Sequence, residues 1–379
     1  MRYIVKEFDK PLLIFSADMN SSNSNLQIEK IYEENDAFFP LNLTVSNGGL
    51  ESWLKHRVIP KNRAYVDALL SKTGLSANRP LGIIAVCKGL SLNDCYWVDS
   101  ADNESSFAKV NLYDNRFSTI LASIAFTGYG SSVRSSLFSS PEFSTNGMLP
   151  KCWRRINGKI YLYKGGTSGF SNTGFEPYSE LYAYQIAKAM EINAIRYTLT
   201  KDLKKSLCSK CELFTSKDYS YMPIGQLVRK GNMEAIREYY QTLGQSFVDA
   251  LDDMIIFDAL ICNVDRHLGN FGVLVNNVTN QIEKPAPLFD HGNSLFSLGG
   301  LDLWNNETAF HEYVETLVPV AYDDFLDEAR KVMQLRHHKM LRQLLNFSFD
   351  RRASRYNLPT NRLAMIEREV QQEFYLIIN

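Results

Sequence analysis

The sequence predicts an α+β protein with two lobes, and the order of its elements is the first reason. Strand patterns come early, and a long helical run, a polar loop, a hairpin and further helices follow. This order is typical of a β-rich lobe joined to a mainly helical lobe, with a cleft between them. The second reason is size, because 379 residues with a 45% hydrophobic fraction can build about two or three domains with sizeable cores.

The first 130 residues form a predicted α/β module whose role the sequence does not reveal. Asn62–Lys72 and Phe117–Phe126 have helical patterns, and a glycine follows each of them. Gly82–Cys87 and Cys95–Asp99 are short apolar runs around a glycine-containing turn, which predicts two strands. No residue of this module suggests chemistry.

Residues 131–215 form the predicted β-rich N-lobe. The serine-rich stretch Ser131–Ser144 is expected to be a junction or loop. Lys159–Lys164 alternates polar and apolar residues, as a half-buried strand does. The other predicted elements are a loop at Gly165–Gly174, a helix at Glu176–Met190, and strands at Ala194–Leu199 and Ser206–Leu213.

Residues 216–379 form the predicted helical C-lobe. Met233–Cys262 is predicted to be one long helical run, and its last part is apolar on nearly every face and therefore buried. The polar loop Asn263–Asn270 follows, and then a hairpin with a first arm at Phe271–Val275 and a second arm that ends at Phe289. The remainder is predicted to be mainly helical.

Three oxygen-bearing side chains carry the chemical interpretation. Asp265 and Asn270 lie five residues apart in the polar loop, and Asp290 follows the hairpin in an Asp-His-Gly segment. Asp265 can accept a proton from an attacking hydroxyl, while Asn270 and Asp290 offer the oxygen ligands that Mg²⁺ prefers. Protein kinases use an Asp, four residues, an Asn and a later D-x-G for this purpose. Either piece alone is more often a turn, but both in this order favour a metal–phosphate site.

A kinase also needs a lysine that holds the phosphates of ATP. Lys164 ends a predicted strand, and Glu180 in the next helix is a candidate to pair with it. Upstream, Ser144–Lys151 contains Gly147, which allows a backbone to approach a phosphate closely. No Walker A motif occurs in the sequence, so the chemistry of P-loop nucleotidases is disfavoured.

The segments Asn263–Gly272 (NVDRHLGNFG) and Pro287–Phe296 (PLFDHGNSLF) resemble the catalytic core of the HipA-like serine/threonine kinases, relatives of the phosphatidylinositol kinase fold. The resemblance extends over about Ser140–Leu345. It implies a two-lobed kinase-like fold with a β-rich N-lobe and a mainly helical C-lobe. The N-terminal module does not resemble the N-terminal subdomain of that family, so DNA-related and partner properties are not transferred.

The resemblance implies a role for each candidate residue. Asp265 would be the catalytic base, Asn270 and Asp290 would be the magnesium ligands, and Lys164 would contact the phosphates of ATP. His267 is expected to hold the catalytic loop by hydrogen bonds rather than to move protons. Further residues implied at the nucleotide are Ser144, Asn146, Gly147, Lys151, Glu180, Glu212 and Phe214, with Ser144 where some members autophosphorylate and Glu212–Phe214 at the adenine hinge.

The resemblance implies an ATP- and Mg²⁺-dependent kinase that phosphorylates Ser or Thr in a protein substrate. Many members are bacterial toxins, so an antitoxin or regulator protein is an expected partner. Two alternatives remain open: a lipid or small-molecule kinase of the same fold, and a nucleotide-binding regulator without transfer activity. An acceptor screen separates the first alternative, and ATP binding without turnover indicates the second.

Composition and charge exclude some classes of protein and indicate where in the cell the chain is expected. The formal net charge of −1 disfavours a globally basic nucleic-acid-binding protein. No apolar run approaches the ~18 residues of a membrane-spanning helix, and the residues after Met1 lack the apolar core of a signal peptide. We therefore expect a cytoplasmic protein without a membrane partner.

For two local patterns we prefer a structural interpretation to a functional one. Cys208 and Cys211 form one CxxC pair, but zinc needs two more ligands, so reduced and partly buried cysteines are favoured. Arg330–Arg362 is rich in basic residues and contains Asp350 as its only acid. It is a candidate surface for nucleic acid or an acidic protein, although a solvated helix face is the more frequent case.

Overall fold

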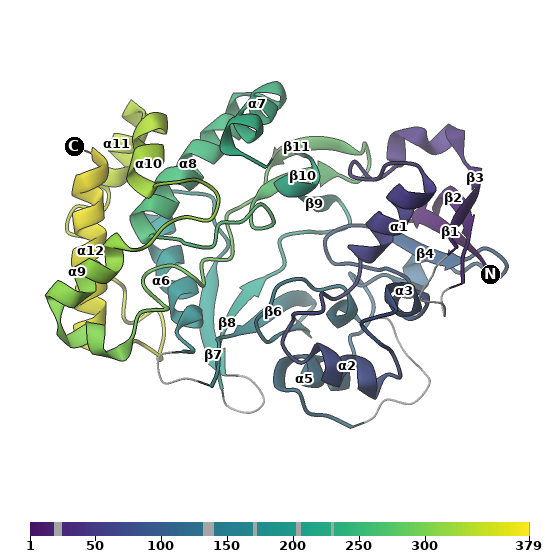
Figure 1. Ribbon diagram of the computed structural model, residues 1–379, viewed down its shortest axis with the longest axis horizontal. Helices are drawn as coiled ribbons and strands as arrows, with labels where there is room; N and C mark the ends of the chain where they lie inside the picture. The colour runs from purple at the N-terminus through teal and green to yellow at the C-terminus, as the bar shows by residue number, and fades with distance from the viewer. Residues whose placement is uncertain (19–24, 132–139, 170–172, 202–205, 229–230, 379) are drawn as a thin grey trace. The chain divides into compact units, whose positions relative to one another are not determined.

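The chain folds into two compact units. The computed structural model describes residues 1–378 except 19–24, 132–139, 170–172, 202–205 and 229–230 (Figure 1). Unit 1 comprises Met1–Lys164, Thr215–Met222 and Leu274–Glu283, and unit 2 comprises Gly165–Phe214, Pro223–Val273 and Lys284–Asn379. Helices and antiparallel sheets are mixed, which confirms the α+β class, whereas the three-part division at residues 130 and 215 stays a prediction. Among the described residues, no helix is long and apolar enough to cross a membrane.

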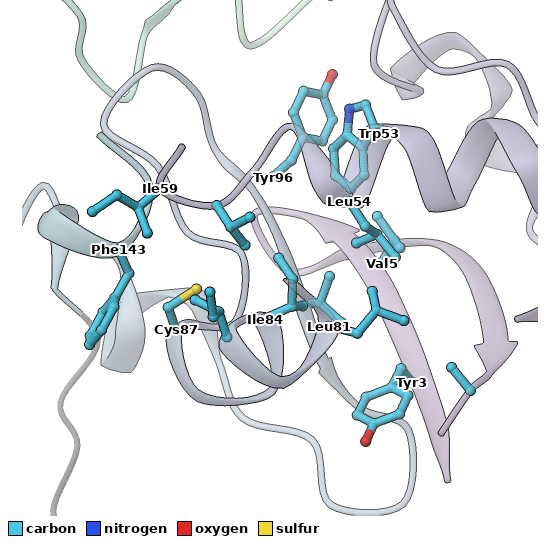
Figure 2. Close-up of a cluster of buried hydrophobic side chains, with 14 of the residues drawn as sticks. Tyr3, Val5, Trp53, Leu54, Ile59, Leu81, Ile84, Cys87, Tyr96 and Phe143 are labelled. Carbon is cyan, nitrogen blue, oxygen red and sulfur yellow. The ribbon is translucent and has the colours of Figure 1, made fainter. Parts of the chain in front are cut away.

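Unit 1 begins with an antiparallel sheet in the order β3-β2-β1-β4. Its strands are β1 (Arg2–Glu7), β2 (Lys10–Ser16), β3 (Gln27–Ile31) and β4 (Tyr96–Ser100), and β4 confirms the predicted strand at Cys95–Asp99. The register pairs Val5 with Leu13 and Tyr3 with Phe15, so these side chains share one face. Figure 2 shows part of the core that they form with residues of the helices, such as Trp53, Leu54, Leu81 and Ile84.

The helices of unit 1 confirm two predictions and correct a third. They are α1 (Asn47–Lys55), α2 (Val66–Lys72), α3 (Pro80–Cys87), α4 (Phe107–Val110) and α5 (Thr119–Thr127), with short 3-10 segments η1 (Glu33–Phe38) and η2 (Pro141–Phe143). α2 lies within its predicted helix, α5 overlaps its prediction and extends one residue beyond it, and Gly128 ends α5 with φ 75°. The predicted strand at Gly82–Cys87 is wrong, because these residues belong to α3. A short run that is apolar on all sides has no period, and Pro80 favours the first turn of a helix.

Two further strand groups complete this part of the fold. β5 (Lys151–Ile156) and β6 (Lys159–Gly165) form an antiparallel hairpin, so the strand predicted at Lys159–Lys164 is confirmed. β9 (Tyr219–Pro223), β10 (Gly272–Asn276) and β11 (Gln281–Pro285) form a sheet in the order β11-β10-β9. The predicted hairpin is confirmed, but its second strand ends at Pro285 rather than at Phe289. Pro285 and Pro287 have no backbone N–H for a ladder. Residues 132–139 of the predicted serine-rich loop and 170–172 of the glycine-rich loop lie outside the described residues.

Unit 2 is mainly helical. It contains α6 (Glu176–Ala189), the antiparallel pair β7 (Tyr197–Lys201) and β8 (Leu207–Glu212), η3 (Ile224–Gln226), α7 (Met233–Leu243), α8 (Gln245–Ile261), η4 (Leu301–Asn305), α9 (Glu307–Glu315), α10 (Phe325–Val332), α11 (Leu335–Arg342) and α12 (Thr360–Ile378). The single helix predicted at Met233–Cys262 is wrong. Gly244, with φ 120° and ψ 169°, separates α7 from α8 because such a backbone cannot continue a helix.

The buried helix α8 is the centre of unit 2. It packs against α7, α10 and α12, and nearly all residues of its C-terminal half are buried, as predicted. The helix ends at Cys262, which adopts a left-handed conformation with φ 47°. This turn directs the chain into the polar loop Asn263–Asn270, whose prediction as a loop is confirmed.

Candidate active site

A buried ion pair fixes the polar loop to the end of α8. Arg266 and Asp258 are both 0% exposed. Nε and Nη2 of Arg266 donate to the two carboxylate oxygens of Asp258 at 2.8 and 2.9 Å. Nη1 of Arg266 donates to the carbonyls of Asn270 at 3.0 Å and Phe289 at 2.7 Å. One guanidinium therefore connects α8, the polar loop and the segment that leads into Asp290.

The electrostatic balance keeps this arginine charged. Burial by itself would lower the pKa of Arg266, but Asp258 beside it outweighs burial, and the pKa is raised above its ordinary value. Asn263 adds a hydrogen bond from Nδ2 to Asp258 Oδ1 at 3.0 Å. A bidentate pair with further hydrogen bonds is the geometry that compensates for the desolvation of both ions.

Asp265 and Asn270 are held so that each keeps one oxygen available. Asp265 Oδ2 accepts a hydrogen bond from Nδ2 of Asn293 at 2.9 Å. Nδ2 of Asn270 donates to the carbonyl of Asp265 at 3.2 Å, which orients the amide. Within the described residues, Oδ1 of Asp265 and Oδ1 of Asn270 have no hydrogen-bond donor. These two atoms can accept a proton or a cation.

Asp290 is positioned by neighbours from α6 and β7. Its backbone is left-handed, with φ 59°, and its N–H donates to the hydroxyl of Tyr197 at 3.2 Å. The next N–H, that of His291, donates to Oε2 of Glu180 at 2.8 Å. Burial, reinforced by Glu180, raises the pKa of Tyr197 well above its usual range, so this hydroxyl stays neutral. Arg266 thus joins the loop of Asp265 and Asn270 to Phe289, the residue before Asp290.

The donor set suits a magnesium ion. Two carboxylates and one amide oxygen are hard ligands of the kind that Mg²⁺ prefers. The side-chain nitrogen of Asn270 is engaged in its hydrogen bond to Asp265, so the side-chain oxygen is the atom left for a cation. These residues would hold Mg²⁺ by Asn270 and Asp290, and the ion would neutralise the charge of nucleotide phosphates.

The hydrogen bonds of His267 to described residues stay within its own loop. The side chain is exposed, and its Nδ1 accepts the N–H of Gly269 at 3.0 Å. The backbone N–H of His267 donates to the carbonyl of Asp265 at 2.8 Å. These contacts are those expected of a residue that shapes the loop, and its assignment to catalysis stays a prediction.

The predicted hinge residues follow β8. Glu212 is the last residue of β8 and is exposed. The ring of Phe214 packs against Phe289, with ring centroids 5.4 Å apart. Phe214 therefore lies against the residue that precedes Asp290, while its contact with adenine stays a prediction.

In unit 1, a buried arginine organises the predicted phosphate loop Ser144–Lys151. Nη1 of Arg63 donates to the carbonyls of Glu142 and Thr145, each at 3.1 Å, and Nη2 donates to the carbonyl of Lys151 at 2.6 Å. Burial lowers the pKa of Arg63 to about 10, so it remains a cation at neutral pH. The loop thereby receives its shape from a residue of the N-terminal region.

Two lysines face each other beside this loop. Lys151 in β5 and Lys164 in β6 are directly opposite in the register, and they are 5% and 6% exposed. Directly opposite residues of a strand pair share one face, so both lysine side chains lie on the same face of the hairpin. Gly147 has φ 89°, and a Cβ at this position would collide with Nζ of Lys151. Asn146 is exposed in the same loop.

The sequence interpretation missed the residues that support the site. The predicted site residues are positioned by four residues that the sequence analysis did not single out, namely Arg63, Arg266, Asn293 and Tyr197. One signal was present, because Asp258 is the lone charge in the apolar end of α8 and needs a partner. The predicted pair of Glu180 and Lys164 stays a prediction, because these residues belong to different units.

The cysteines show no metal chemistry in the part of the chain that the structure describes. Cys208 and Cys211 in β8 are buried and do not form a disulfide. No group of three His, Cys, Asp or Glu residues suited to a metal occurs among the described residues.

Comparisons with known proteins place the fold. No protein-family model and no curated protein matches the sequence. Among solved structures, the chain is similar to the Shewanella oneidensis MR-1 toxin–antitoxin system HipA, HipB and its operator DNA complex, with a TM-score of 0.51 and 13% identity over 99% of this chain and 96% of that chain. It is also similar to the Helicobacter pylori proinflammatory kinase CtkA, with a TM-score of 0.49 and 16% identity over 63% of this chain and 92% of that chain.

The likeness to HipA is one of fold. The chain has the kinase-like fold that the catalytic motifs implied. Because the match covers 99% of this chain, it includes the N-terminal residues that the sequence resemblance left out. Whether these residues form the N-terminal subdomain of that family stays a prediction.

Proposed function

We propose that the protein is an ATP- and Mg²⁺-dependent kinase that phosphorylates Ser or Thr of a protein substrate. The observation that carries this proposal is the oxygen set of Asp265, Asn270 and Asp290, which Arg266 holds together through its contacts with the loop and with Phe289. The HipA-like fold supports it. Phosphoryl transfer needs this combination of a base, a metal site and positioned phosphates.

Each residue has a defined part in the proposed reaction. Asp265 accepts the proton of the attacking hydroxyl through Oδ1, while Asn293 fixes its other oxygen. Bound Mg²⁺ would supply charge neutralisation at the phosphates. Lys151 and Lys164 provide positive charge for phosphate oxygens, and the backbone at Gly147 allows close approach. Glu212 and Phe214 are the proposed neighbours of adenine.

The partner follows from the neighbour's own assembly. HipA was solved together with HipB and operator DNA. We propose by analogy that an antitoxin-type protein binds this chain and that its kinase activity is toxic without that partner. A protein acceptor with Ser or Thr, a cytoplasmic setting and no membrane partner belong to the same proposal.

Replacing Asp290 with asparagine tests the metal site. Loss of one negative charge is expected to raise the Mg²⁺ concentration for half-maximal transfer by about tenfold or more. The assay follows labelled phosphate from ATP to a panel of a protein mixture, an inositol lipid and a sugar. Asp323 is an exposed aspartate to which no role at the site is assigned, so Asp323→Asn is the matched control and should behave as wild type.

The panel also decides between the candidate functions. Transfer to protein Ser or Thr supports the proposal, and transfer only to lipid or sugar establishes the alternative acceptor class. ATP binding without any transfer by the wild type would show a regulator. Undiminished transfer by Asp290→Asn at low Mg²⁺ would contradict the metal assignment.

Ser144 is proposed as an autophosphorylation site that switches the enzyme off. It is 8% exposed, and its hydroxyl donates to the carbonyl of Leu90 at 2.7 Å. A phosphate with about two negative charges cannot remain in this position, so the loop must leave it. We expect activity to fall as mass spectrometry detects phosphate on Ser144, and Ser144→Ala to keep its activity. Phosphate on Ser144 without loss of activity, or an unmodified Ser144 after prolonged incubation with ATP, would contradict this.

A further inference from the structure

Arg362 is a buried cation without a counter-ion. It lies in the first turn of α12 and is only 3% exposed. Its Nε is enclosed and has no hydrogen-bond acceptor. In the part of the chain that the structure describes, no ion pair or hydrogen bond joins Arg362 to another residue. A charge in such a place is costly unless something pairs with it.

Two aromatic rings account for part of the stabilisation of Arg362. Its Cζ lies 3.9 Å from the ring centroid of Phe175 and 3.9 Å from that of Trp304. Cation–π attraction of this kind is favourable, and it is stronger where water is excluded. The rings do not replace an oxygen acceptor, however, so the enclosed Nε–H of Arg362 is left without a hydrogen bond.

Trp304 contributes a second unsatisfied donor at the same place. It lies in η4 and is 5% exposed. Its indole Nε1–H is enclosed and has no acceptor among the described residues. Buried donors without partners are rare in folded proteins. Arg362 and Trp304 stack on each other, and each has such a donor. Because Arg362 is also charged, this arrangement indicates that an acceptor is missing.

Among the residues that the structure describes, no carboxylate is hydrogen-bonded to Arg362 or to the indole of Trp304. The ionisable groups that face Arg362 are the phenols of Tyr178 and Tyr313, which burial keeps neutral by raising their pKa values. Glu176, the neighbour of Phe175, uses Oε1 for the backbone N–H of Thr167 at 3.0 Å. Burial lowers the pKa of Arg362 to about 10, so the side chain is still charged at neutral pH.

We propose that Arg362 and Trp304 form a binding site for an oxyanion from solution, whose carboxylate or phosphate oxygens accept hydrogen bonds from the guanidinium and the indole. The planar donor fork of arginine matches both kinds of group. The site uses none of the residues assigned to phosphoryl transfer. It therefore stands whether or not the proposed kinase function is correct.

The test compares inorganic phosphate, acetate and chloride at equal ionic strength. The intact protein is titrated, and both its melting temperature and its tryptophan fluorescence are followed. All titrations are repeated in a Lys164→Ala background, so that phosphate bound at the proposed nucleotide site is recognised separately. We expect a saturable response to phosphate, to acetate or to both, which Lys164→Ala retains and Arg362→Leu weakens by about tenfold or more.

Trp304→Phe keeps an aromatic ring against Arg362 and removes only the N–H, so it serves if Arg362→Leu does not fold. A severalfold weaker response in this variant supports the site. A response to phosphate alone indicates a phosphate-bearing ligand, and a response to acetate alone indicates a carboxylate-bearing one. The proposal is wrong if neither anion acts differently from chloride, or if the variants respond as the wild type does.

Discussion

Replacing Asp265 with asparagine is expected to lower kcat for phosphoryl transfer by about 10²–10⁴-fold while ATP still binds. The amide cannot accept the proton of the attacking hydroxyl, which is the role proposed for Oδ1. In the wild type, Oδ2 of Asp265 accepts a hydrogen bond from Asn293 at 2.9 Å. The amide oxygen of the variant can accept the same hydrogen bond, so the loop should keep its shape. Single-turnover transfer from labelled ATP measures the rate, and calorimetry measures the ATP affinity.

Two other variants make this result specific. Asp323→Asn removes an exposed carboxylate of the same unit and should leave kcat unchanged. His267→Ala removes one acceptor for the Gly269 N–H and should lower kcat by no more than about tenfold. If Asp265→Asn keeps wild-type kcat, or if His267→Ala loses as much activity as Asp265→Asn does, the assignment of the base is wrong.

The parts of the site that could be predicted are those whose signals are local. Asp265, Asn270 and Asp290 stand out because polar residues follow a buried helix and a hairpin in a fixed order. Lys164 stands out because its strand alternates. Such patterns need only neighbouring residues, and they predict the loop, the strand and the hairpin correctly except for the end of the second hairpin strand.

The supporting contacts could not be predicted because they join residues far apart in the sequence. Arg63 donates to the carbonyl of Lys151 across 88 positions of sequence. Asn293 reaches Asp265 across 28 positions, and no pattern of spacing indicates either contact. Only the fold brings these residues together, so their roles are visible in the structure alone.

The errors in secondary structure have local causes. The segment Gly82–Cys87 is apolar throughout, and a run of that length fits a buried strand and a buried helix equally well. α7 and α8 have continuous helical patterns, and only Gly244 shows that the chain breaks between them. An isolated glycine inside a helical pattern is often tolerated, so its effect depends on the tertiary contacts of the two helices.

Replacing Arg266 with methionine is expected to destabilise the protein by about 3–5 kcal/mol. The variant leaves Asp258 buried without its cation and removes the donors to the carbonyls of Asn270 and Phe289. Urea unfolding followed by circular dichroism measures the change. Arg336→Met is the matched control, because Arg336 pairs with Asp253 in a partly exposed position and should cost less than about 1 kcal/mol.

A double variant separates the cost of the unpaired charge from the loss of packing. Arg266→Met combined with Asp258→Leu leaves no buried ion, so we expect it to be more stable than Arg266→Met alone. Its kinase activity should remain low, because Asn270 and Phe289 no longer share a donor that holds the loop beside Asp290. Recovered stability without recovered transfer would show that the ion pair positions the site. An Arg266→Met protein within about 1 kcal/mol of wild type would show instead that water or another donor replaces the guanidinium, contrary to its complete burial.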